Sequence, residues 1–510
     1  MIHPLPRISS ISTIRSHRRS IGSTRRYTIA FKPDRFACDF RKEELKMVIE
    51  EIQGDFARVN NELLKGPIYP NVTPEEIRCY LRSRYDFTKA MALDEAVADV
   101  EQMLQTWQVQ VTHPRYFGLF NPSVTLASVI ADTLVAMYNP QLASWRTSPA
   151  GNEIERHTLG WLAAKFGLPT DTHANFTSGG SEANLSAVIV ALTRAFPGYG
   201  EDGLRCLDAI PAIYLTEEAH HSFSKIAHMT GLGRRALRTV ATSSDFKMDL
   251  EDLGKRVAED RKNGFAPFMV IGTGGTTTAG VIDPLRGLGR FCQDENLWFH
   301  VDAAWGGAAV ISPTLRHHLS GIEAADSITC DAHKWFSVPM GSGMFFCRHP
   351  DSVAQAFRAE AAYMPGKVMG PAFDPYTTSV QWSRRFIGLK LFLSLAQHGE
   401  SGYAEMIEYQ TRMANVLRDA LIASGWRIVN TTPLPVVCFT RDDLDITQFL
   451  ASLREHQTAW MSEARIKGAS VVRACITSFR TTETDIHWVV EEMNHLVPRD
   501  AIHSLSPAEC

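Results

Sequence analysis

A lysine in apolar surroundings is the first candidate for chemistry in this chain of 510 residues. Lys334 lies in the stretch DAHKWF (331–336), directly after the apolar run SITC. Burial disfavours the charged form of an amine, and a neutral amine forms a Schiff base with an aldehyde. The alternative is an exposed lysine whose aliphatic stem covers Trp335. This stretch alone favours neither interpretation.

A loop that could bind an anion is the second candidate. In FTSGGSEANL (176–185) a strand-like segment ends, and two glycines and two serines precede a helical pattern. Free backbone N–H groups at a helix start bind anions, and glycine lets the anion come close. Gly179, Gly180 and Ser181 would cradle a phosphate, although the spacing is not that of a nucleoside-triphosphate loop. The alternative is a plain capped turn with Ser181 as the N-cap.

A glycine- and threonine-rich loop, GTGGTTTAGVIDP (272–284), follows another apolar run. A dinucleotide-binding loop would open a helix at this point, and here threonines and VIDP follow instead. We interpret the segment as a polar loop at a strand end, in which Thr277 offers a hydroxyl to a ligand. The alternative is a glycine-rich turn without a ligand.

An acid closes the apolar run LWFHVDAAWGG (297–307). A buried carboxylate such as Asp302 needs a cationic or hydrogen-bonding partner. A metal shared with His300 is one option, but no tight cluster of ligands completes such a site, so we expect no metal. A protonated heterocyclic nitrogen is the other option. Ala303 and Ala304 are small enough to let a flat ring lie against the strand end.

These features together fit one cofactor. Pyridoxal 5'-phosphate needs an anion cradle, a carboxylate at its ring nitrogen and a lysine for its aldehyde. A ring also needs a flat partner, and EEAHHSFSKIA (217–227) offers His220 or His221. The sequence therefore predicts a pyridoxal-phosphate site in which Lys334 forms the Schiff base.

The elements that must position these residues alternate along the chain. From about residue 112 to 399, strand-like runs alternate with helical ones, which is typical of an α/β fold with a mostly parallel sheet covered by helices. Ligands of such sheets bind beyond the carboxyl ends of the strands. We expect residues 33–111 to form a helical N-terminal segment, residues 400–500 a small α+β C-terminal domain, and residues 501–510 a tail.

Composition excludes several classes of protein. The net charge of −4 gives no basic field for nucleic acid, and no apolar run is long enough to span a membrane. Nine cysteines without a CxxC pair predict reduced thiols and a cytoplasmic location. Residues 1–32 are rich in arginine and serine, which indicates a disordered basic tail or a mitochondrial transit peptide.

The chain resembles the fold-type I, group II pyridoxal-phosphate decarboxylases. HVDAAWGG and DAHKWF carry the resemblance, together with HPRYFGLFNP, SPAGNEIE, TSGGSEAN, HHSFSKIA, GTTTAGVIDP and SVQWSRRFIGLKLFLSLAQHG, over roughly residues 35–500. The resemblance implies a seven-stranded sheet and the decarboxylation of an L-amino acid to its amine. It also implies a homodimer with the active site at the subunit interface.

By position, the resemblance implies roles for individual residues. Lys334 matches the lysine that binds the cofactor, Asp302 matches the partner of the ring nitrogen, and His220 rather than His221 matches the stacking histidine. The expected cofactor-binding residues are Gly179, Gly180, Ser181, His220, Thr277, Asp302, Ala304, His333 and Lys334.

The resemblance also implies an acid on a mobile loop of the partner subunit. Tyr363 matches the loop tyrosine that returns a proton after carbon dioxide leaves, and Tyr376 is its rival. The expected catalytic residues are therefore Lys334, His220 and Tyr363. Asp331 departs from the pattern, because aromatic decarboxylases have asparagine there.

The substrate is less defined than the cofactor. YFGLFNP (116–122) resembles a stretch that lines the substrate pocket, and Leu119 and Phe120 favour an aromatic or bulky apolar substrate. Arg115 or Arg146 could instead recognise an acidic side chain. Aspartate, glutamate and diaminobutyrate stay open as substrates, as does another pyridoxal-phosphate reaction such as aldehyde synthesis. A non-catalytic scaffold is disfavoured, because it need not keep the lysine, acid, histidine and loop tyrosine.

Overall fold

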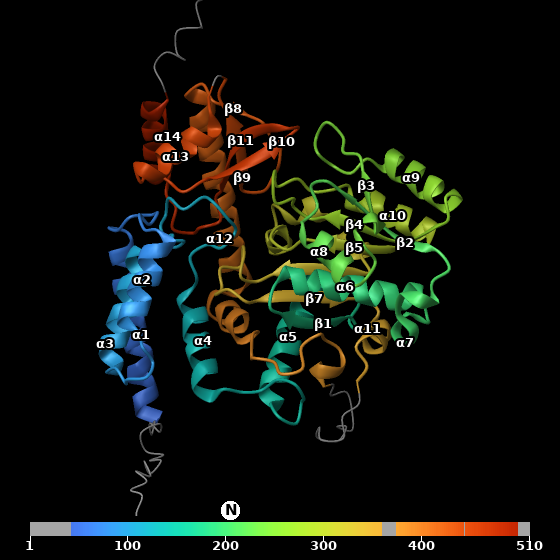
Figure 1. Ribbon diagram of the computed structural model, residues 1–510, viewed down its shortest axis with the longest axis horizontal. Helices are drawn as coiled ribbons and strands as arrows, with labels where there is room; N and C mark the ends of the chain where they lie inside the picture. The colour runs from blue at the N-terminus through green and yellow to red at the C-terminus, as the bar shows by residue number, and fades with distance from the viewer. Residues whose placement is uncertain (1–41, 360–373, 443, 498–510) are drawn as a thin grey trace, which may run out of the picture. The chain divides into compact units, whose positions relative to one another are not determined.

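The computed structural model describes residues 42–359, 374–442 and 444–497 (Figure 1). The chain divides into two compact units, residues 1–50 and 51–510. The described part of the first unit is the beginning of helix α1 (Lys42–Leu63), which continues into the second unit. All other described elements belong to the second unit.

A sheet of seven strands forms the centre of the described part of the second unit. The order across the sheet is β1-β7-β6-β5-β4-β2-β3. β7 is antiparallel to both β1 and β6, and the remaining neighbours in the sheet are parallel. This arrangement confirms the predicted mostly parallel sheet. The strands are β1 (His173–Thr177), β2 (Ile210–Thr216), β3 (Leu237–Val240), β4 (Phe265–Thr273), β5 (Trp298–Asp302), β6 (Ser327–Asp331) and β7 (Gly343–Cys347).

Helices cover both faces of this sheet, which explains why its strands are nearly continuous apolar runs. β4 shows the alternation, because successive side chains of a strand point to opposite faces. Met269 and Ile271 share a core with helix α6 (Gly180–Ala195), whereas Val270 shares a core with helix α10 (Leu285–Glu295). The helices around the sheet are α4 (Leu126–Tyr138), α5 (Pro149–Lys165), α7 (Tyr199–Asp202), α8 (Ser222–Met229), α9 (Leu250–Lys262) and α11 (Pro350–Ala356).

A long helix, α12 (Leu389–Ala423), joins the large sheet to a smaller antiparallel one (Figure 1). It packs against α4 and α5, and also against α14 (Glu483–Leu496). Gly399 interrupts α12 with φ of 66° and ψ of 178°, a conformation that glycine adopts without a side-chain clash.

The smaller sheet has four strands in the described residues, in the order β10-β11-β9-β8. Its elements are β8 (Arg427–Ile428), β9 (Val436–Thr440), β10 (Ser462–Ile466) and β11 (Ala469–Cys475), with α13 (Ile446–Glu455) and α14. Phe439, Phe449 and Val489 are among the residues of its core. Short 3-10 helices elsewhere are η2 (Gly203–Cys206), η3 (Arg234–Ala236), η4 (Gly306–Ile311), η5 (Arg316–Leu319), η6 (Ile322–Ala324) and η7 (Pro375–Thr377).

Two N-terminal helices bury little of their own surface. α2 (Pro74–Arg84) begins with a capping box, in which Thr73 and Glu76 exchange hydrogen bonds. Neither α2 nor α3 (Leu93–Thr106) contains a buried residue. None of the described helices combines the length and the apolar character that crossing a bilayer requires.

Candidate active site

The strand ends of the large sheet meet at a cavity of about 320 Å³. Its lining comes from loops and helix starts that follow β1, β2, β4, β5 and β6, as expected for a ligand site beyond the carboxyl ends of parallel strands. Every residue that the sequence predicts as a cofactor contact lines this cavity, whereas Tyr363 lies outside the described residues. The lining residues are Ser178, Gly179, Gly180, Ser181, Glu182, Asn184, His220, Thr273, Gly275, Thr277, Asp302, Ala304, Trp305, Asp331, His333 and Lys334.

Lys334 enters the cavity from the turn that follows β6. Its Nζ lies 3.0 Å from Oδ2 of Asp331, and its side chain is 23% exposed. Trp335 and Phe336, the next two residues, are fully buried in the core. The apolar neighbours of Lys334 in the sequence therefore hold the turn in place, and the amine faces the cavity.

Asp331 is a buried carboxylate beside that amine. Its side chain is 1% exposed, Oδ2 also lies 3.7 Å from Nε2 of His333, and Oδ1 has no hydrogen-bond partner in the described structure. A Cβ at Gly180 would lie 2.9 Å from Oδ2, so a larger residue would collide with this carboxylate. The sequence did not predict that Asp331 would lie beside the Lys334 amine. The neighbouring strands β5 and β6 both end in an aspartate.

The start of α6 supplies the predicted anion cradle. α6 begins at Gly180 with Gly179 as its N-cap, and no described side chain caps it. The alternative in which Ser181 is the N-cap is therefore wrong, because Ser181 lies inside the first turn. Glu182 holds the loop from the side, accepting hydrogen bonds from Ser178 N (2.8 Å) and Gln381 Nε2 (2.9 Å). The free N–H groups of this first turn remain available to an anion.

Asp302 closes β5 with both carboxylate oxygens held. Oδ1 accepts a hydrogen bond from Ala304 N at 3.1 Å, and Oδ2 accepts one from Asn184 Nδ2 at 2.8 Å. Asp302 as a whole residue is 5% exposed. His300 bonds to Asn184 and Ser327, and no group of three or more potential metal ligands occurs in the described part of the chain.

Two histidines of the cavity are neutral imidazoles that accept backbone hydrogen bonds. Nδ1 of His220 accepts from Ser222 N at 3.2 Å, and Nδ1 of His333 accepts from Ser342 N at 3.1 Å. Burial lowers the pKa of both histidines. His221 does not line the cavity and is the N-cap residue of α8. The structure therefore places His220, rather than His221, where a flat ring could stack.

Comparison with known proteins identifies the fold and its cofactor. The family model described as "Pyridoxal-dependent decarboxylase conserved domain" matches residues 80–441. The chain belongs to the pyridoxal-dependent decarboxylase family. Membership confirms the predicted cofactor, pyridoxal 5'-phosphate, and the predicted class of enzyme, a carboxy-lyase.

The relatives of this chain are named for different substrates and products. The 4-hydroxyphenylacetaldehyde synthase of Rhodiola rosea is 25% identical over 87% of this chain and 92% of its own. The aromatic-L-amino-acid decarboxylase of Bacillus atrophaeus is 27% identical over 77% and 83%, and the L-2,4-diaminobutyrate decarboxylase of Acinetobacter baumannii is 30% identical over 68% and 71%. A solved tryptophan decarboxylase of Catharanthus roseus shares the fold, with a TM-score of 0.81, 24% identity, and coverage of 92% of this chain and all of its own.

The cavity fits pyridoxal phosphate on the chemistry of its own residues. The uncapped start of α6 suits the phosphate, the carboxylate of Asp302 suits the ring nitrogen, and the amine of Lys334 suits the aldehyde. Ala304 and His220 border the same space. Sequence reasoning missed Asn184, Thr273, Gly275 and Trp305. Only Asn184 left a signal, because it lies one helical turn after Gly180 and so shares a face of α6 with the cradle.

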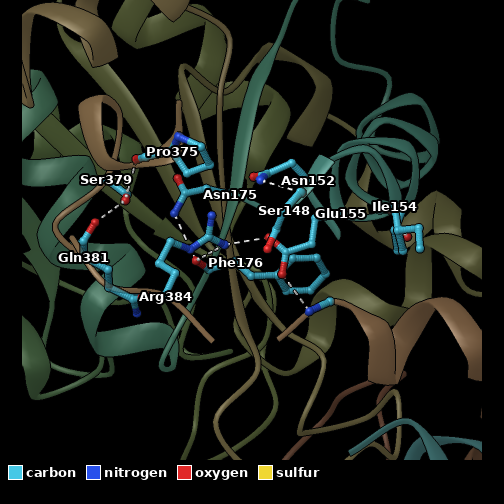
Figure 2. A network of polar contacts seen from close by, with 12 residues as sticks. Ser148, Asn152, Ile154, Glu155, Asn175, Phe176, Pro375, Ser379, Gln381 and Arg384 are labelled. Carbon is cyan, nitrogen blue, oxygen red and sulfur yellow. Dashed lines mark hydrogen bonds and ion pairs between the residues drawn. The ribbon is translucent and has the colours of Figure 1, made fainter. Parts of the chain in front are cut away.

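A buried ion pair anchors the segment that leads into α12 (Figure 2). NH2 of Arg384 lies 2.7 Å from Oε2 of Glu155, and the two side chains are 1% and 5% exposed. Glu155 also accepts a hydrogen bond from Gly388 N, and Arg384 donates to the carbonyl of Phe176 in β1. This network ties α5 and β1 to the chain that returns after residue 374.

The residues expected to contact the substrate differ in how close they lie to the cavity. The ring of Phe120 stacks on Trp305, which lines the cavity, at 4.3 Å between centroids, whereas Leu119 is 48% exposed. Arg115 lies over the ring of Trp488, and Arg146 is exposed. Neither arginine is among the described residues that line the cavity. Tyr376, the rival loop acid, packs against the ring of Trp382.

Proposed function

We propose that this enzyme decarboxylates an L-amino acid with an aromatic or bulky apolar side chain to the corresponding amine. One observation carries the reaction: the amine of Lys334, the carboxylate of Asp302 and the start of α6 converge on one cavity. Trp305 places an apolar ring in the wall of this cavity, Phe120 stacks on that ring, and no described arginine lines the cavity. The Bacillus relative, an aromatic-L-amino-acid decarboxylase by name, supports the same class of substrate.

The residues of the chain divide the work of this reaction. Bound pyridoxal phosphate supplies a ring that accepts the electrons of the broken carbon–carbon bond. The Lys334 amine would hold the cofactor aldehyde and later release the product amine, and the Asp302 carboxylate would accept a hydrogen bond from the ring nitrogen. His220 would offer a flat partner to the ring. We assign the return of the proton to Tyr363 of a second subunit, with His220 as its aid.

Two features of the N-terminal helices support a homodimer. Four apolar residues of α3 recur at helical spacing and are exposed: Leu93, Val97, Val100 and Leu104. Val97, Val100 and Leu104 also line a groove that continues onto Val59 and Leu63 of α1. An apolar stripe that the described part of its own chain leaves exposed is typical of an interface. A second copy of the chain would cover it, which agrees with an active site shared between subunits.

An acidic substrate is the second candidate, because of Arg473. This guanidinium is buried, packs over the ring of Phe120 at 4.9 Å and donates to Gly118 O and Ser462 Oγ. Its Nε and NH2 are buried and have no hydrogen-bond partner in the described structure. A buried cation needs an anion, and a substrate carboxylate next to Phe120 would provide one.

The deciding experiment combines the visible spectrum with a product assay. We expect a visible absorption band in the purified protein that Lys334→Ala removes, and one aromatic or bulky L-amino acid that yields its amine and carbon dioxide in equal amounts. An aldehyde product, as the name of the Rhodiola relative suggests for that protein, would replace simple decarboxylation with aldehyde synthesis. Turnover of aspartate, glutamate or diaminobutyrate alone would overturn the proposed substrate class.

A further inference from the structure

A chain of four buried polar groups stands behind Asp302 and runs along one face of the sheet to the first residues of β5 and β6. Asn184 Nδ2 donates to Asp302 Oδ2 at 2.8 Å, and Asn184 Oδ1 lies 3.1 Å from His300 Nε2. His300 Nδ1 lies 2.8 Å from Ser327 Oγ, to which Trp298 Nε1 donates at 2.9 Å. None of the five residues is more than 6% exposed.

The chemistry of the two ends sets the direction of every hydrogen bond in this chain. The indole nitrogen of Trp298 only donates, so Ser327 accepts from it and turns its own hydrogen to Nδ1 of His300. At the other end a carboxylate only accepts, so the amide nitrogen of Asn184 faces Asp302 and its oxygen faces His300. His300 must then carry its hydrogen on Nε2.

Burial supports this assignment of a neutral imidazole. Burial lowers the pKa of His300 to about 4, so at neutral pH one ring nitrogen donates and the other accepts, as the chain requires. With a neutral imidazole, Nε2–H donates to Asn184 Oδ1 and Nδ1 accepts from Ser327 Oγ, so every donor in the chain meets an acceptor. The chain therefore has one consistent arrangement.

We propose that Asn184 and His300 are positioning residues for Asp302, an inference that rests on the proposed role of Asp302 at the cofactor ring nitrogen. Ala304 N and Asn184 Nδ2 hold one oxygen each, so the carboxylate cannot rotate without breaking one of these bonds. Asn184 in turn cannot rotate, because its oxygen is held by His300. The consequence is a carboxylate that is oriented before the cofactor arrives, which lowers the cost of binding the ring.

The test compares two cofactors that differ at one atom. Pyridoxal phosphate has a ring nitrogen for Asp302, and its 1-deaza analogue has carbon at that position. We expect Asn184→Leu to weaken the binding of pyridoxal phosphate by about ten-fold and to change the binding of the deaza analogue by less than about two-fold. Dissociation constants from quenching of tryptophan fluorescence give the readout without any turnover. Equal losses for both cofactors, or no loss for either, would overturn the proposal.

Matched variants separate positioning from general damage. Asn152→Leu removes another buried asparagine, whose amide donates to Ser144 O and Ser148 O, and we expect both cofactors to bind as in the unmodified protein. His300→Gln keeps an N–H donor for Asn184 and should retain more of the preference for pyridoxal phosphate than His300→Leu. If Asn184→Leu does not fold, Ser327→Ala decides by the same comparison, because it removes only one hydroxyl from the chain.

The outcomes also distinguish this proposal from the proposed function. An unmodified protein that binds neither cofactor, or whose spectrum does not depend on Lys334, would contradict the proposed function itself. A protein that binds pyridoxal phosphate through Lys334, but whose preference over the deaza analogue survives in Asn184→Leu, would contradict only the positioning role.

Discussion

Asp331 and Lys334 lie one turn apart at the end of β6, with Oδ2 of the acid 3.0 Å from Nζ of the lysine. The carboxylate adds a negative charge to a cavity that must receive a phosphate, since its oxygens lie next to Gly180 in the cradle. We expect Asp331→Asn to strengthen the binding of pyridoxal phosphate by about ten-fold, because a like charge is removed and the lysine loses its competing partner. Pyridoxal without the phosphate should gain less, and a weaker binding of pyridoxal phosphate would show that Asp331 supports the site.

Two variants of His220 separate a role in stacking on the cofactor from a role in proton transfer. His220→Phe keeps a flat ring and His220→Ala removes it, so cofactor affinity should stay within about three-fold in the first and fall about ten-fold in the second. If His220 aids the proton return, both variants lose about a hundred-fold in kcat. Titration with pyridoxal phosphate and steady-state kinetics measure the two effects separately. A phenylalanine variant with full kcat would leave His220 with stacking alone.

The Arg384–Glu155 pair predicts a large effect on stability (Figure 2). Arg384→Met leaves the carboxylate of Glu155 buried without its cation, and we expect the free energy of unfolding to fall by about 3–5 kcal/mol. The adjacent Arg385 offers a matched control, because its pair with Asp132 is 55% and 27% exposed. Arg385→Met should cost less than about 1 kcal/mol. Urea unfolding measures both, and equal losses would contradict the importance of burial.

Acid should weaken the fold through its buried histidines. The pKa of His300 is about 4 in the folded chain and about 6.5 in an unfolded one, so the unfolded state binds a proton in this window and the folded state does not. Stability contributed by neutral His300 is therefore present above pH 6.5 and is lost as the pH falls toward 4, by about 3 kcal/mol.

His113 and His173, whose pKa values are also about 4, act in the same direction. His300→Gln should therefore reduce the pH dependence of the free energy of unfolding without removing it. Denaturant unfolding at several values between pH 4 and 7 measures this slope. An unchanged slope in His300→Gln would show that His300 takes up its proton in the folded chain.

The exposed stripe of α3 predicts the state of association. Val100→Glu puts a charge in the middle of this stripe, and we expect the mass in light scattering to shift from two chains toward one. Gln102→Glu changes an exposed residue between the stripe positions and should leave the mass unchanged. A Val100→Glu protein that keeps the mass of two chains would place the interface elsewhere.

Much of the fold follows from local patterns in the sequence. Residues 211–216, 268–273, 327–331 and 343–347 lie in β2, β4, β6 and β7 and are rich in apolar residues, because a strand buried on both faces is apolar over most of its length. The capping box of Thr73 and Glu76 is likewise local. Lys334, Asp302 and the glycines of the cradle were found because their residue types are rare at such positions.

The contacts that the sequence did not reveal are long-range. Asn184 and Asp302 meet only because α6 crosses the sheet beside β5, and Arg384 reaches Glu155 only after α5 and β1 are in place. The place of Asn184 on the cradle face of α6 is a local signal, but no local pattern shows that a carboxylate of β5 is its partner. Ser181 looked like an N-cap because serine is common there, whereas Gly179 takes that place in the structure.

One strand has a consequence for the order in which the active site is built. β7 pairs Gly343 with Thr177 of β1 on one edge and with Asp331 of β6 on the other. Gly343 thus lies between the strand that precedes the cradle and the strand that precedes Lys334, and it comes after both of them in the sequence. During synthesis on the ribosome no strand can join β1 to β6 until Gly343 has emerged, and pairing over such long separations is slow. We therefore expect recovery of cofactor binding to be among the last events of refolding.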